Sequence, residues 1–251
     1  MESKNVESIV NEVVARVMKE KGSSLAGIDK PLAPYDKVLA KKMEHSMIRF
    51  DATPAMVKQF CEEAVTYGFR NVALPPCYVP YAVKLLSGTG VKVATAVGFP
   101  MAITSTKIKV AETIDVIENG ATEIDLPVNI GMVKAGELKA VKADIDAVIA
   151  AANKRALIKV AVDLGALTQE EIVKVALLAR LSGADFIKIA QCSRKEGVNA
   201  EDIKFMRQIV GNDMQLKADG GVRSYTVALE VIAAGAATIG SSGSPKVVTI
   251  Q

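Results

Sequence analysis

The sequence has no tryptophan, and aromatic residues make up only 4% of its 251 positions. It therefore supplies few side chains on which nucleic-acid bases could stack. Its 31 basic and 28 acidic residues give a net charge of +3, which offers no strongly basic surface for nucleic acid or for an anionic membrane. No apolar run reaches the roughly 18 residues that a membrane span needs. We therefore expect neither nucleic acid nor a membrane as a partner.

Histidine and cysteine are also scarce. The single histidine is His45, and the three cysteines, Cys61, Cys77 and Cys192, are far apart in the chain. A zinc enzyme needs several histidines or clustered cysteines, so we expect no metal site. Three scattered cysteines do not suggest a disulfide framework, and they favour the reducing cytoplasm. We interpret His45 as a structural hydrogen-bonding residue, and Cys77 and Cys192 as packing or spacer residues.

Residues 1–21 carry an apolar stripe at helical spacing, and residues 22–35 have the composition of a linker. The stripe consists of Val6, Ile9, Val10, Val13, Val14, Val17 and Met18. Such a helix could pack on the following domain, dock on another protein or lie on a membrane surface, although its sparse basic charge disfavours the last. Its pattern resembles the encapsulation peptides of bacterial microcompartment enzymes. That resemblance implies docking on a shell protein through residues 6–18.

From residue 36 onward, short apolar runs alternate with segments of helical period. The eight runs are 43–48, 71–74, 91–97, 123–128, 157–162, 186–190, 215–218 and 238–241, and helices are expected at 53–67, 108–119 and 169–181. Gly68, Gly120, Gly183 and Gly235 stand where such helices should end. This alternation predicts a parallel sheet covered by helices. Eight units predict one α/β domain over residues 36–251, a (β/α)8 TIM barrel with an extra N-terminal amphipathic helix.

Several lysines stand inside the apolar runs, where catalytic groups of this fold also lie, near the carboxyl ends of strands. Lys188 and Lys217 belong to the sixth and seventh runs, and Lys159 belongs to the fifth. A buried lysine needs a partner. One interpretation is an ion pair with Asp125 or Asp163 that only fills the barrel. The other is an amine kept neutral by burial and by a second cation, able to attack a carbonyl group.

Small residues follow the seventh and eighth runs, at Gly220-Gly221 and Ser241-Ser242-Gly243. The loops after these two strands often bind phosphate in TIM barrels. Glycine exposes backbone N–H groups, and a helix that opens after the last loop would also favour an anion. The same residues are ordinary in turns. Their position makes a phosphate-binding site the preferred interpretation.

These segments, taken in order, resemble the deoxyribose-phosphate aldolase family over about residues 36 to 246. The stretch from His45 to Thr53 is similar to the family's "DHTLLKPDAT". The other matching segments are Tyr78-Val79-Pro80, Gly98-Phe99-Pro100, Glu123-Ile124-Asp125 with Asn129-Ile130-Gly131, Gly183-Ala184-Asp185-Phe186-Ile187-Lys188, and Lys217 with Gly220-Gly221-Val222-Arg223. Any one of them alone would be a weak signal, whereas the ordered set is specific.

The resemblance implies a class I aldolase that reversibly cleaves 2-deoxy-D-ribose 5-phosphate to acetaldehyde and D-glyceraldehyde 3-phosphate without a cofactor. Lys188 would form the Schiff base, Lys217 would perturb it, and Asp125 would transfer protons through water. The phosphate and the rest of the substrate would contact Gly220, Gly221, Ser241, Ser242, Glu44, Ser46 and Ile189. We also expect a homo-oligomer whose partner is a small phosphorylated sugar or aldehyde.

The chain departs from the family pattern near the substrate. The usual Thr-Ser-Thr-Gly after the lysine is replaced by Ile189-Ala190-Gln191-Cys192, and Glu44 stands in place of aspartate. Asp219 occupies a position where a small residue is usual. Its charge would repel a phosphate dianion unless a nearby cation offsets it; the candidates are Arg223, Lys195 and Lys246. We therefore expect the carbon–carbon chemistry to persist while substrate choice shifts, for example to another short-chain aldehyde pair.

Two other functions remain open at this point. A non-catalytic lumen or scaffold protein could retain the barrel and use its N-terminal helix for docking, although such a protein has no need of a buried lysine pair. An isomerase or epimerase could bind phosphate in the same place and use Asp125 as its base. Failure to form a reducible imine would favour that alternative.

Overall fold

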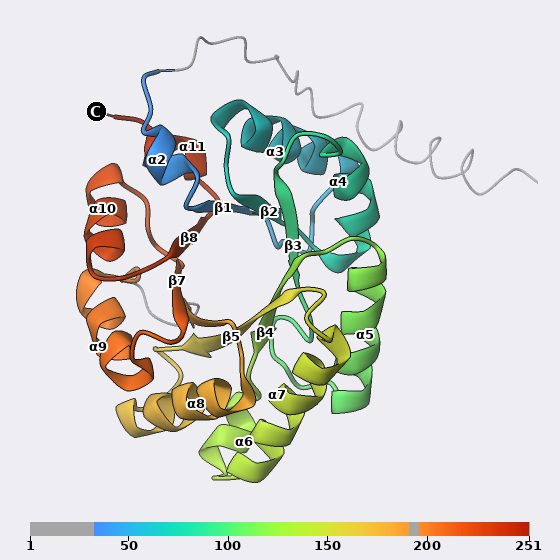
Figure 1. Cartoon of the computed structure of the whole chain (residues 1–251), viewed down its shortest axis with the longest axis vertical. Coiled ribbons are helices and arrows are strands. Elements are labelled where there is room, and N and C mark those ends of the chain that lie inside the picture. Colours follow the sequence, from blue (N-terminus) through green and yellow to red (C-terminus); the bar gives the residue numbers. More distant parts are fainter. Residues whose placement is uncertain (1–32, 191–195, 251) are drawn as a thin grey trace, which may run out of the picture. The chain divides into compact units, whose positions relative to one another are not determined.

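The computed structural model describes residues 33–190 and 196–250. Within these residues, eight parallel strands form a closed barrel in sequence order, β1 to β8, which confirms the predicted (β/α)8 fold (Figure 1). The strands are β1 Met43–Ser46, β2 Asn71–Ala73, β3 Lys92–Ala96, β4 Glu123–Pro127, β5 Leu157–Asp163, β6 Phe186–Ala190, β7 Gln215–Asp219 and β8 Thr238–Ser241. The predicted helix at 1–21 and most of the linker lie outside the described residues.

Helices form a layer around the barrel, as Figure 1 shows. They are α2 Lys37–Ala40, α3 Pro54–Tyr67, the short 3-10 helix η1 Pro76–Tyr78, α4 Val79–Leu85, α5 Thr106–Glu118, α6 Ile130–Lys134, α7 Leu138–Ala152, α8 Gln169–Ser182, α9 Ala200–Val210, α10 Tyr225–Ala233 and α11 Ser244–Val248. The chain enters the barrel domain at Tyr35, which forms an antiparallel bridge with Thr249. Among the described residues, no helix is long and apolar enough to cross a membrane.

Local sequence signals explain where the main helices begin and end. Thr168 caps α8 in a capping box with Glu171, since each side chain accepts a hydrogen bond from the other residue's backbone N–H. Gly68 and Gly183 end α3 and α8 in the left-handed conformation, as predicted. Helix α5 begins at Thr106, two residues before the predicted start. Strand β1 ends at Ser46, two residues before the predicted end, and its last hydrogen bond to β2 runs from Met47 N–H to the Ala73 carbonyl.

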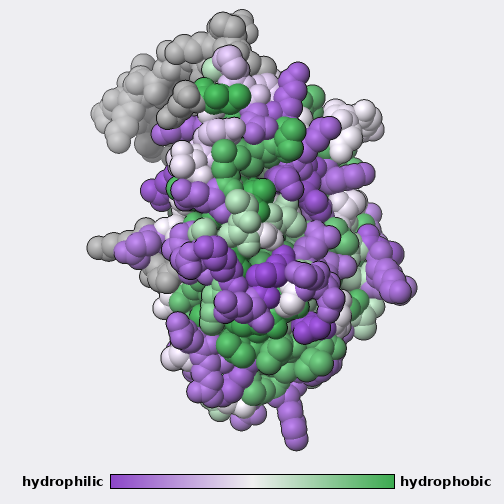
Figure 2. Space-filling model, turned by 60° about the vertical axis from the view of Figure 1, so that its left-hand side comes forward, coloured by the Kyte–Doolittle hydropathy of each residue, from purple (hydrophilic) through white to green (hydrophobic). Residues whose placement is uncertain are grey.

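The hydrophobic core lies between the barrel and its helices. Every second strand residue faces outward and is buried under a helix, for example Ile124, Val160, Ile187 and Leu216. Burial of one such side chain contributes about 1.5 to 3 kcal/mol of hydrophobic free energy. The face shown in Figure 2 is mixed, with hydrophilic residues in purple interspersed with green hydrophobic patches.

The inward-facing residues decide where a site can form. The register pairs Asp125 with Lys159 and Lys188 with Lys217, so these charged residues all face the barrel axis. Nearer the carboxyl ends of the strands, most inward positions hold small residues: Ser46, Ala73, Ala96, Ala161, Ala190 and Gly240, with Asp219 among the exceptions. With the carboxyl ends of the strands taken as the top, charged side chains fill the lower part of the barrel and leave space at its carboxyl-terminal mouth.

Candidate active site

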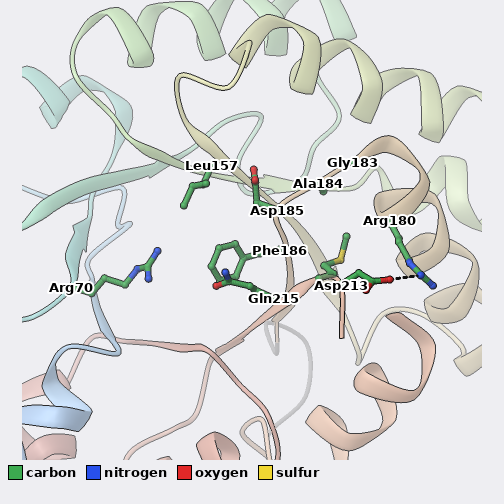
Figure 3. Close-up of a pocket in the computed structure, with 10 residues that line it drawn as sticks. Arg70, Leu157, Arg180, Gly183, Ala184, Asp185, Phe186, Asp213 and Gln215 are labelled. Carbon is green, nitrogen blue, oxygen red and sulfur yellow. Dashed lines mark hydrogen bonds and ion pairs between the residues drawn. The ribbon is translucent and has the colours of Figure 1, made fainter. Parts of the chain in front are cut away.

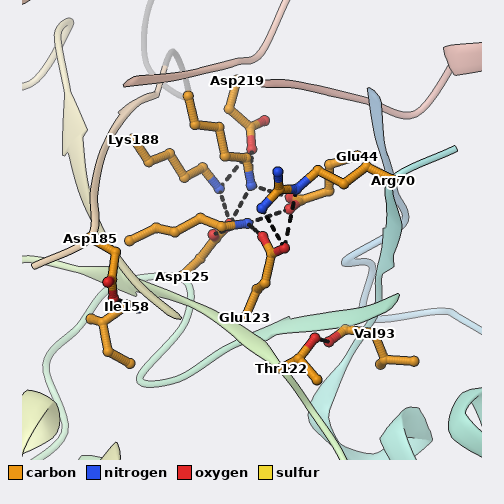
Figure 4. Close-up of polar contacts among 12 residues, drawn as sticks. Glu44, Arg70, Val93, Thr122, Glu123, Asp125, Ile158, Asp185, Lys188 and Asp219 are labelled. Atoms are coloured by element: carbon orange, nitrogen blue, oxygen red, sulfur yellow. Dashed lines mark hydrogen bonds and ion pairs between the residues drawn. The ribbon is translucent and has the colours of Figure 1, made fainter. Parts of the chain in front are cut away.

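A network of ion pairs occupies the interior of the barrel (Figure 4). Among the described residues, it joins four cations and four carboxylates: Arg70, Lys159, Lys188 and Lys217 with Glu44, Glu123, Asp125 and Asp219. The formal charges balance. Burial of this many charges is tolerated only because each has partners of opposite sign.

The upper part of the network contains the two lysines of the predicted site. Lys188 Nζ lies 2.7 Å from Asp125 Oδ2, and Lys217 Nζ lies 2.8 Å from the same oxygen. The structure thus brings Lys188, Lys217 and Asp125 together, which strand adjacency alone could not establish. Lys217 also pairs with Glu44 below it. The Lys217 side chain is fully buried, whereas that of Lys188 is 10% exposed, so Lys188 is the amine nearer to solvent.

Asp219 joins both lysines from the side of the mouth. Its Oδ2 lies 2.8 Å from Lys188 Nζ and 3.2 Å from Lys217 Nζ. The sequence suggested Arg223, Lys195 or Lys246 as the cation that offsets this carboxylate. The structure instead pairs it with the two barrel lysines, because Asp219 shares the inward parity of Lys217 on β7. Lys195 lies outside the described residues.

Lys159 fills the lower part of the barrel. Its Nζ lies 2.6 Å from carboxylate oxygens of both Glu44 and Glu123, and 3.8 Å from Asp125. Arg70 provides Glu123 with a second cation at 2.7 Å. For Lys159, the interpretation as an ion pair that fills the barrel therefore applies, although Glu44 and Glu123 are the main partners. The sequence analysis did not single out Glu123 or Arg70 as members of this network.

The protonation of Lys188 differs from the expectation of a neutral amine. Burial lowers the pKa of Lys188, and Lys217 lowers it further, but Asp125 and Asp219 outweigh both and raise the pKa above its usual value. The same lysines hold the pKa values of Asp125 and Asp219 below their usual range, against the opposing effect of burial. In this substrate-free state Lys188 is thus an ammonium group, and it must lose a proton before it can act as a nucleophile.

A cavity of about 590 Å³ opens above Lys188 at the carboxyl ends of the strands. Its lining includes five of the seven predicted substrate-binding residues, Ser46, Gly220, Gly221, Ser241 and Ser242, together with Lys188, Asp219 and Arg223. Glu44, Asp125 and Lys217 lie below it. Ile189 is fully buried and belongs to the hydrophobic core, because it alternates with the inward-facing Lys188. The structure therefore does not bring Glu44 or Ile189 to the cavity wall.

The loop after β7 has a conformation that requires glycine. Gly220 and Gly221 have φ values of 97° and 79°, in the left-handed region that disfavours other residues. A Cβ atom on Gly221 would lie 2.1 Å from the Cα atom of Gly197, so the two backbones touch here. After β8, the Ser241 hydroxyl accepts a hydrogen bond from the Gly243 N–H. Small residues thus form the parts of both loops that line the cavity.

His45 does not reach the cavity. Its ring is buried, stacks on Phe60 at 3.9 Å, and shares a 2.9 Å hydrogen bond with Glu63 through Nε2. These contacts agree with a structural role. The carboxylates of Glu44, Asp125 and Asp219 lie close enough together to share a metal ion, but lysine amines pair with all three of them.

A second cavity, of about 540 Å³, lies at the opposite end of the barrel (Figure 3). Leu157, Phe186 and Gln215 begin their strands there, and Arg180 at its edge pairs with Asp213. The amino-terminal face of a TIM barrel usually contributes stability rather than catalysis. The cavity above Lys188 is therefore the candidate active site.

Comparison with known proteins identifies the family of this chain. A family described as "DeoC/LacD family aldolase" matches residues 36–244. A deoxyribose-phosphate aldolase of Clostridium perfringens is 44% identical over 206 residues, which are 82% of this chain and 92% of that protein. One from Caldanaerobacter subterraneus is 40% identical over 212 residues, 84% of this chain and 92% of that protein.

Solved structures agree with the fold. A putative deoxyribose-phosphate aldolase from Coccidioides immitis has a TM-score of 0.79 and 30% identity, and the match covers 97% of this chain and 96% of the other. The deoxyribose phosphate aldolase of Aeropyrum pernix, described as a unique tetramer, has a TM-score of 0.77 and 25% identity, with 97% of each chain covered. The chain belongs to the DeoC/LacD family of aldolases.

Proposed function

We propose that this aldolase reversibly cleaves 2-deoxy-D-ribose 5-phosphate to acetaldehyde and D-glyceraldehyde 3-phosphate through a Schiff base on Lys188. The observation that carries the proposal is the position of Lys188: its amine belongs to the buried network and also lines the cavity. Lys159 and Lys217 are fully buried below it. The choice of substrate in this proposal comes from the relatives named deoxyribose-phosphate aldolase, which are 40 to 44% identical to this chain.

The reaction begins when the Lys188 ammonium group loses its proton to water in the cavity. The neutral amine attacks the carbonyl carbon of the open-chain sugar, and loss of water gives an iminium ion. This cation takes the place of the ammonium charge beside Asp125, so the network remains balanced. Cleavage of the carbon–carbon bond releases glyceraldehyde 3-phosphate and leaves an enamine. Its protonation, through water associated with Asp125 and Lys217, and subsequent hydrolysis release acetaldehyde.

The phosphate group binds, in this proposal, at the loops after β7 and β8. Gly220 and Gly221 would contribute backbone N–H groups, and Ser241 and Ser242 would contribute hydroxyl groups. These residues border the cavity on the side of Asp219, and Arg223 adds a positive charge to its lining. A phosphate here places the sugar between the loops and Lys188. No metal ion or organic cofactor takes part.

Reductive trapping tests the assignment of Lys188. We expect borohydride with deoxyribose 5-phosphate or with acetaldehyde to label Lys188, as located by mass mapping, and we expect Lys188→Met to lose both label and cleavage. Lys174→Met, at an exposed lysine of α8 that pairs with Glu170, serves as the matched control. Label on a different residue would refute the assignment. Absence of any imine would favour the isomerase or epimerase alternative.

For the N-terminal segment, we propose docking on a microcompartment shell protein through residues 6–18, within the cytoplasm. The family match begins at residue 36, which leaves residues 1–35 outside it. Residues 1–35 fused to a fluorescent protein should enter co-expressed microcompartment shells. Val13→Asp, within the apolar stripe, should abolish entry, whereas Asn11→Asp, outside it, should not. Equal entry of both variants would contradict the proposal.

We also propose that the aldolase domain forms a homo-oligomer. The described surface exposes large apolar side chains, among them Val38 and Leu181 at more than 70%, and a structural relative is described as tetrameric. Sedimentation analysis should give a mass that is a multiple of 26.6 kDa. A monomer at micromolar concentration would contradict this.

A further inference from the structure

Asp219 is the carboxylate of the network that faces the cavity. It ends β7, directly before the two glycines of the loop, and its side chain points toward the barrel axis (Figure 4). Its side chain is 19% exposed and lines the cavity, whereas that of Asp125 is 2% exposed and lies below the cavity. A substrate bound above Lys188 would therefore meet Asp219 before it met Asp125.

Both carboxylates contact the same two lysine amines. Asp125 Oδ2 already accepts hydrogen bonds from both Lys188 and Lys217. Asp219 Oδ2 is also buried and lies 2.8 Å from Lys188 Nζ and 3.2 Å from Lys217 Nζ. Because the exposed part of the Asp219 side chain lines the cavity beside the nucleophile, its carboxylate can accept a proton from a bound substrate.

The neighbouring strand provides the space for this carboxylate. A Cβ atom on Gly240 of β8 would lie 2.7 Å from Asp219 Oδ2, so any larger residue there would displace the carboxylate. Gly240 pairs in register with Asp219 across β7 and β8 and does not have a positive φ value. Glycine is therefore required here by the position of Asp219 and not by the backbone conformation.

We propose that Asp219 is a catalytic base of the cleavage step, accepting the proton of the hydroxyl group β to the Schiff base. This inference rests on the proposed function. Asp219 contacts the Lys188 amine, where the carbonyl carbon would bind, and directly precedes Gly220-Gly221, where the phosphate would bind. In a phosphorylated β-hydroxy aldehyde, the hydroxyl-bearing carbon lies between the carbonyl carbon and the phosphate.

The step is balanced in atoms and electrons. The Asp219 carboxylate takes the proton of the β-hydroxyl group, and the electrons of that O–H bond form the carbonyl group of the departing aldehyde. The electrons of the broken carbon–carbon bond form the double bond of the enamine. The iminium nitrogen accepts the former π electrons and becomes neutral. The carboxylic acid left on Asp219 returns its proton to water before the next turnover.

Asp219→Asn separates this role from imine formation. With acetaldehyde, which has no β-hydroxyl group, borohydride should still label Lys188. The label should extend to lower pH than in the wild type, because loss of one carboxylate lowers the pKa of Lys188. The rate of deoxyribose 5-phosphate cleavage should fall about 100-fold or more, as is typical for loss of a general base. Asp213→Asn, at an exposed aspartate at the opposite end of the barrel, is the matched control.

The two measurements distinguish the possible failures. If Asp219 only keeps Lys188 protonated, Asp219→Asn will cleave as fast as the wild type or faster near neutral pH, and the inference is overturned while the proposed function stands. If the wild type gives no label on Lys188, the proposed function itself fails. Gly240→Ala keeps the charge but displaces the carboxylate, so we expect the same loss of cleavage with retained label. Full cleavage by this variant would also overturn the inference.

Discussion

Lys159 offers a sharp test of the buried network, because it lies away from the cavity and its side chain is fully buried. Its amine lies 2.6 Å from a carboxylate oxygen of Glu44 and 2.6 Å from one of Glu123. Lys159→Met would keep a long apolar stem that fills the same space. It would remove one positive charge from a network that is balanced among the described residues, and leave the two carboxylates with one cation fewer.

The expected cost follows from this geometry. Removal of one partner from a buried ion pair destabilises a protein by about 3 to 5 kcal/mol. In this network Glu44 keeps Lys217 and Glu123 keeps Arg70, so we expect the lower end, about 3 kcal/mol at pH 8. A loss of this size is a large part of the roughly 5 to 15 kcal/mol that holds a typical domain folded.

The pH dependence gives the prediction its sign. In the wild type, burial raises the pKa of Glu123, but Lys159 and Arg70 lower it by more. The ionised carboxylate therefore stabilises the fold at pH values above 4.5, the pKa of this group in the unfolded chain. Without Lys159 the pKa of the folded state rises, and the native state then takes up protons more readily than the unfolded state. The loss of stability should therefore be smaller at pH 5 than at pH 8.

Urea unfolding at the two pH values, followed by circular dichroism, measures the difference in free energy of unfolding. A double variant, Lys159→Met with Glu123→Gln, should recover part of the loss at pH 8, since it removes one unpaired charge. The reasoning is refuted if Lys159→Met is as stable as the wild type at pH 8, or if the difference does not shrink at pH 5.

Three further predictions concern the active site. The rate of borohydride trapping should rise with pH above neutrality, because Asp125 and Asp219 raise the pKa of Lys188 by more than its burial lowers it; a plateau below neutrality would contradict this. Lysines lower the pKa values of Asp125 and Asp219 despite burial. The two carboxylates should therefore contribute their full stabilisation above pH 3.8, the pKa in the unfolded chain, and lose it as the pH falls further, which acid unfolding curves would show. Gly221→Ala should cost about 1 to 3 kcal/mol of stability through backbone strain and crowding against Gly197, and should raise KM more for deoxyribose 5-phosphate than for deoxyribose; an equal rise for both would argue against a phosphate site at this loop.

The fold was predictable because its signals are local and repeat eight times. Each apolar run has the length of a strand, and glycines end the helices at Gly68 and Gly183. Element ends were less predictable, since apolar character continues past the last ladder hydrogen bond. Ile48 extends the first apolar run, for example, although β1 ends at Ser46.

The site was predictable in its members more than in its contacts. Position along the strands indicated Lys188, Lys217 and Asp125, and the loops after β7 and β8 indicated the small residues. The partners of Asp219 were missed, although strand alternation contains the signal: Asp219 is two residues after Lys217 and must face the same way. Which inward-facing charges then pair depends on the stagger of eight strands, which the sequence does not state.

Charge balance links the departure at Asp219 to the mechanism. With a small residue at this position, the described network would hold four cations and three carboxylates, and the excess positive charge would favour a neutral Lys188. Asp219 restores the balance and keeps Lys188 charged, which by itself disfavours attack on a carbonyl group. If Asp219 only slowed imine formation, it would lower the activity of the aldolase with no compensating effect. Its carboxylate at the cavity wall offers the compensating role, because a carboxylate that hinders the first step can accept the proton that the cleavage step must release.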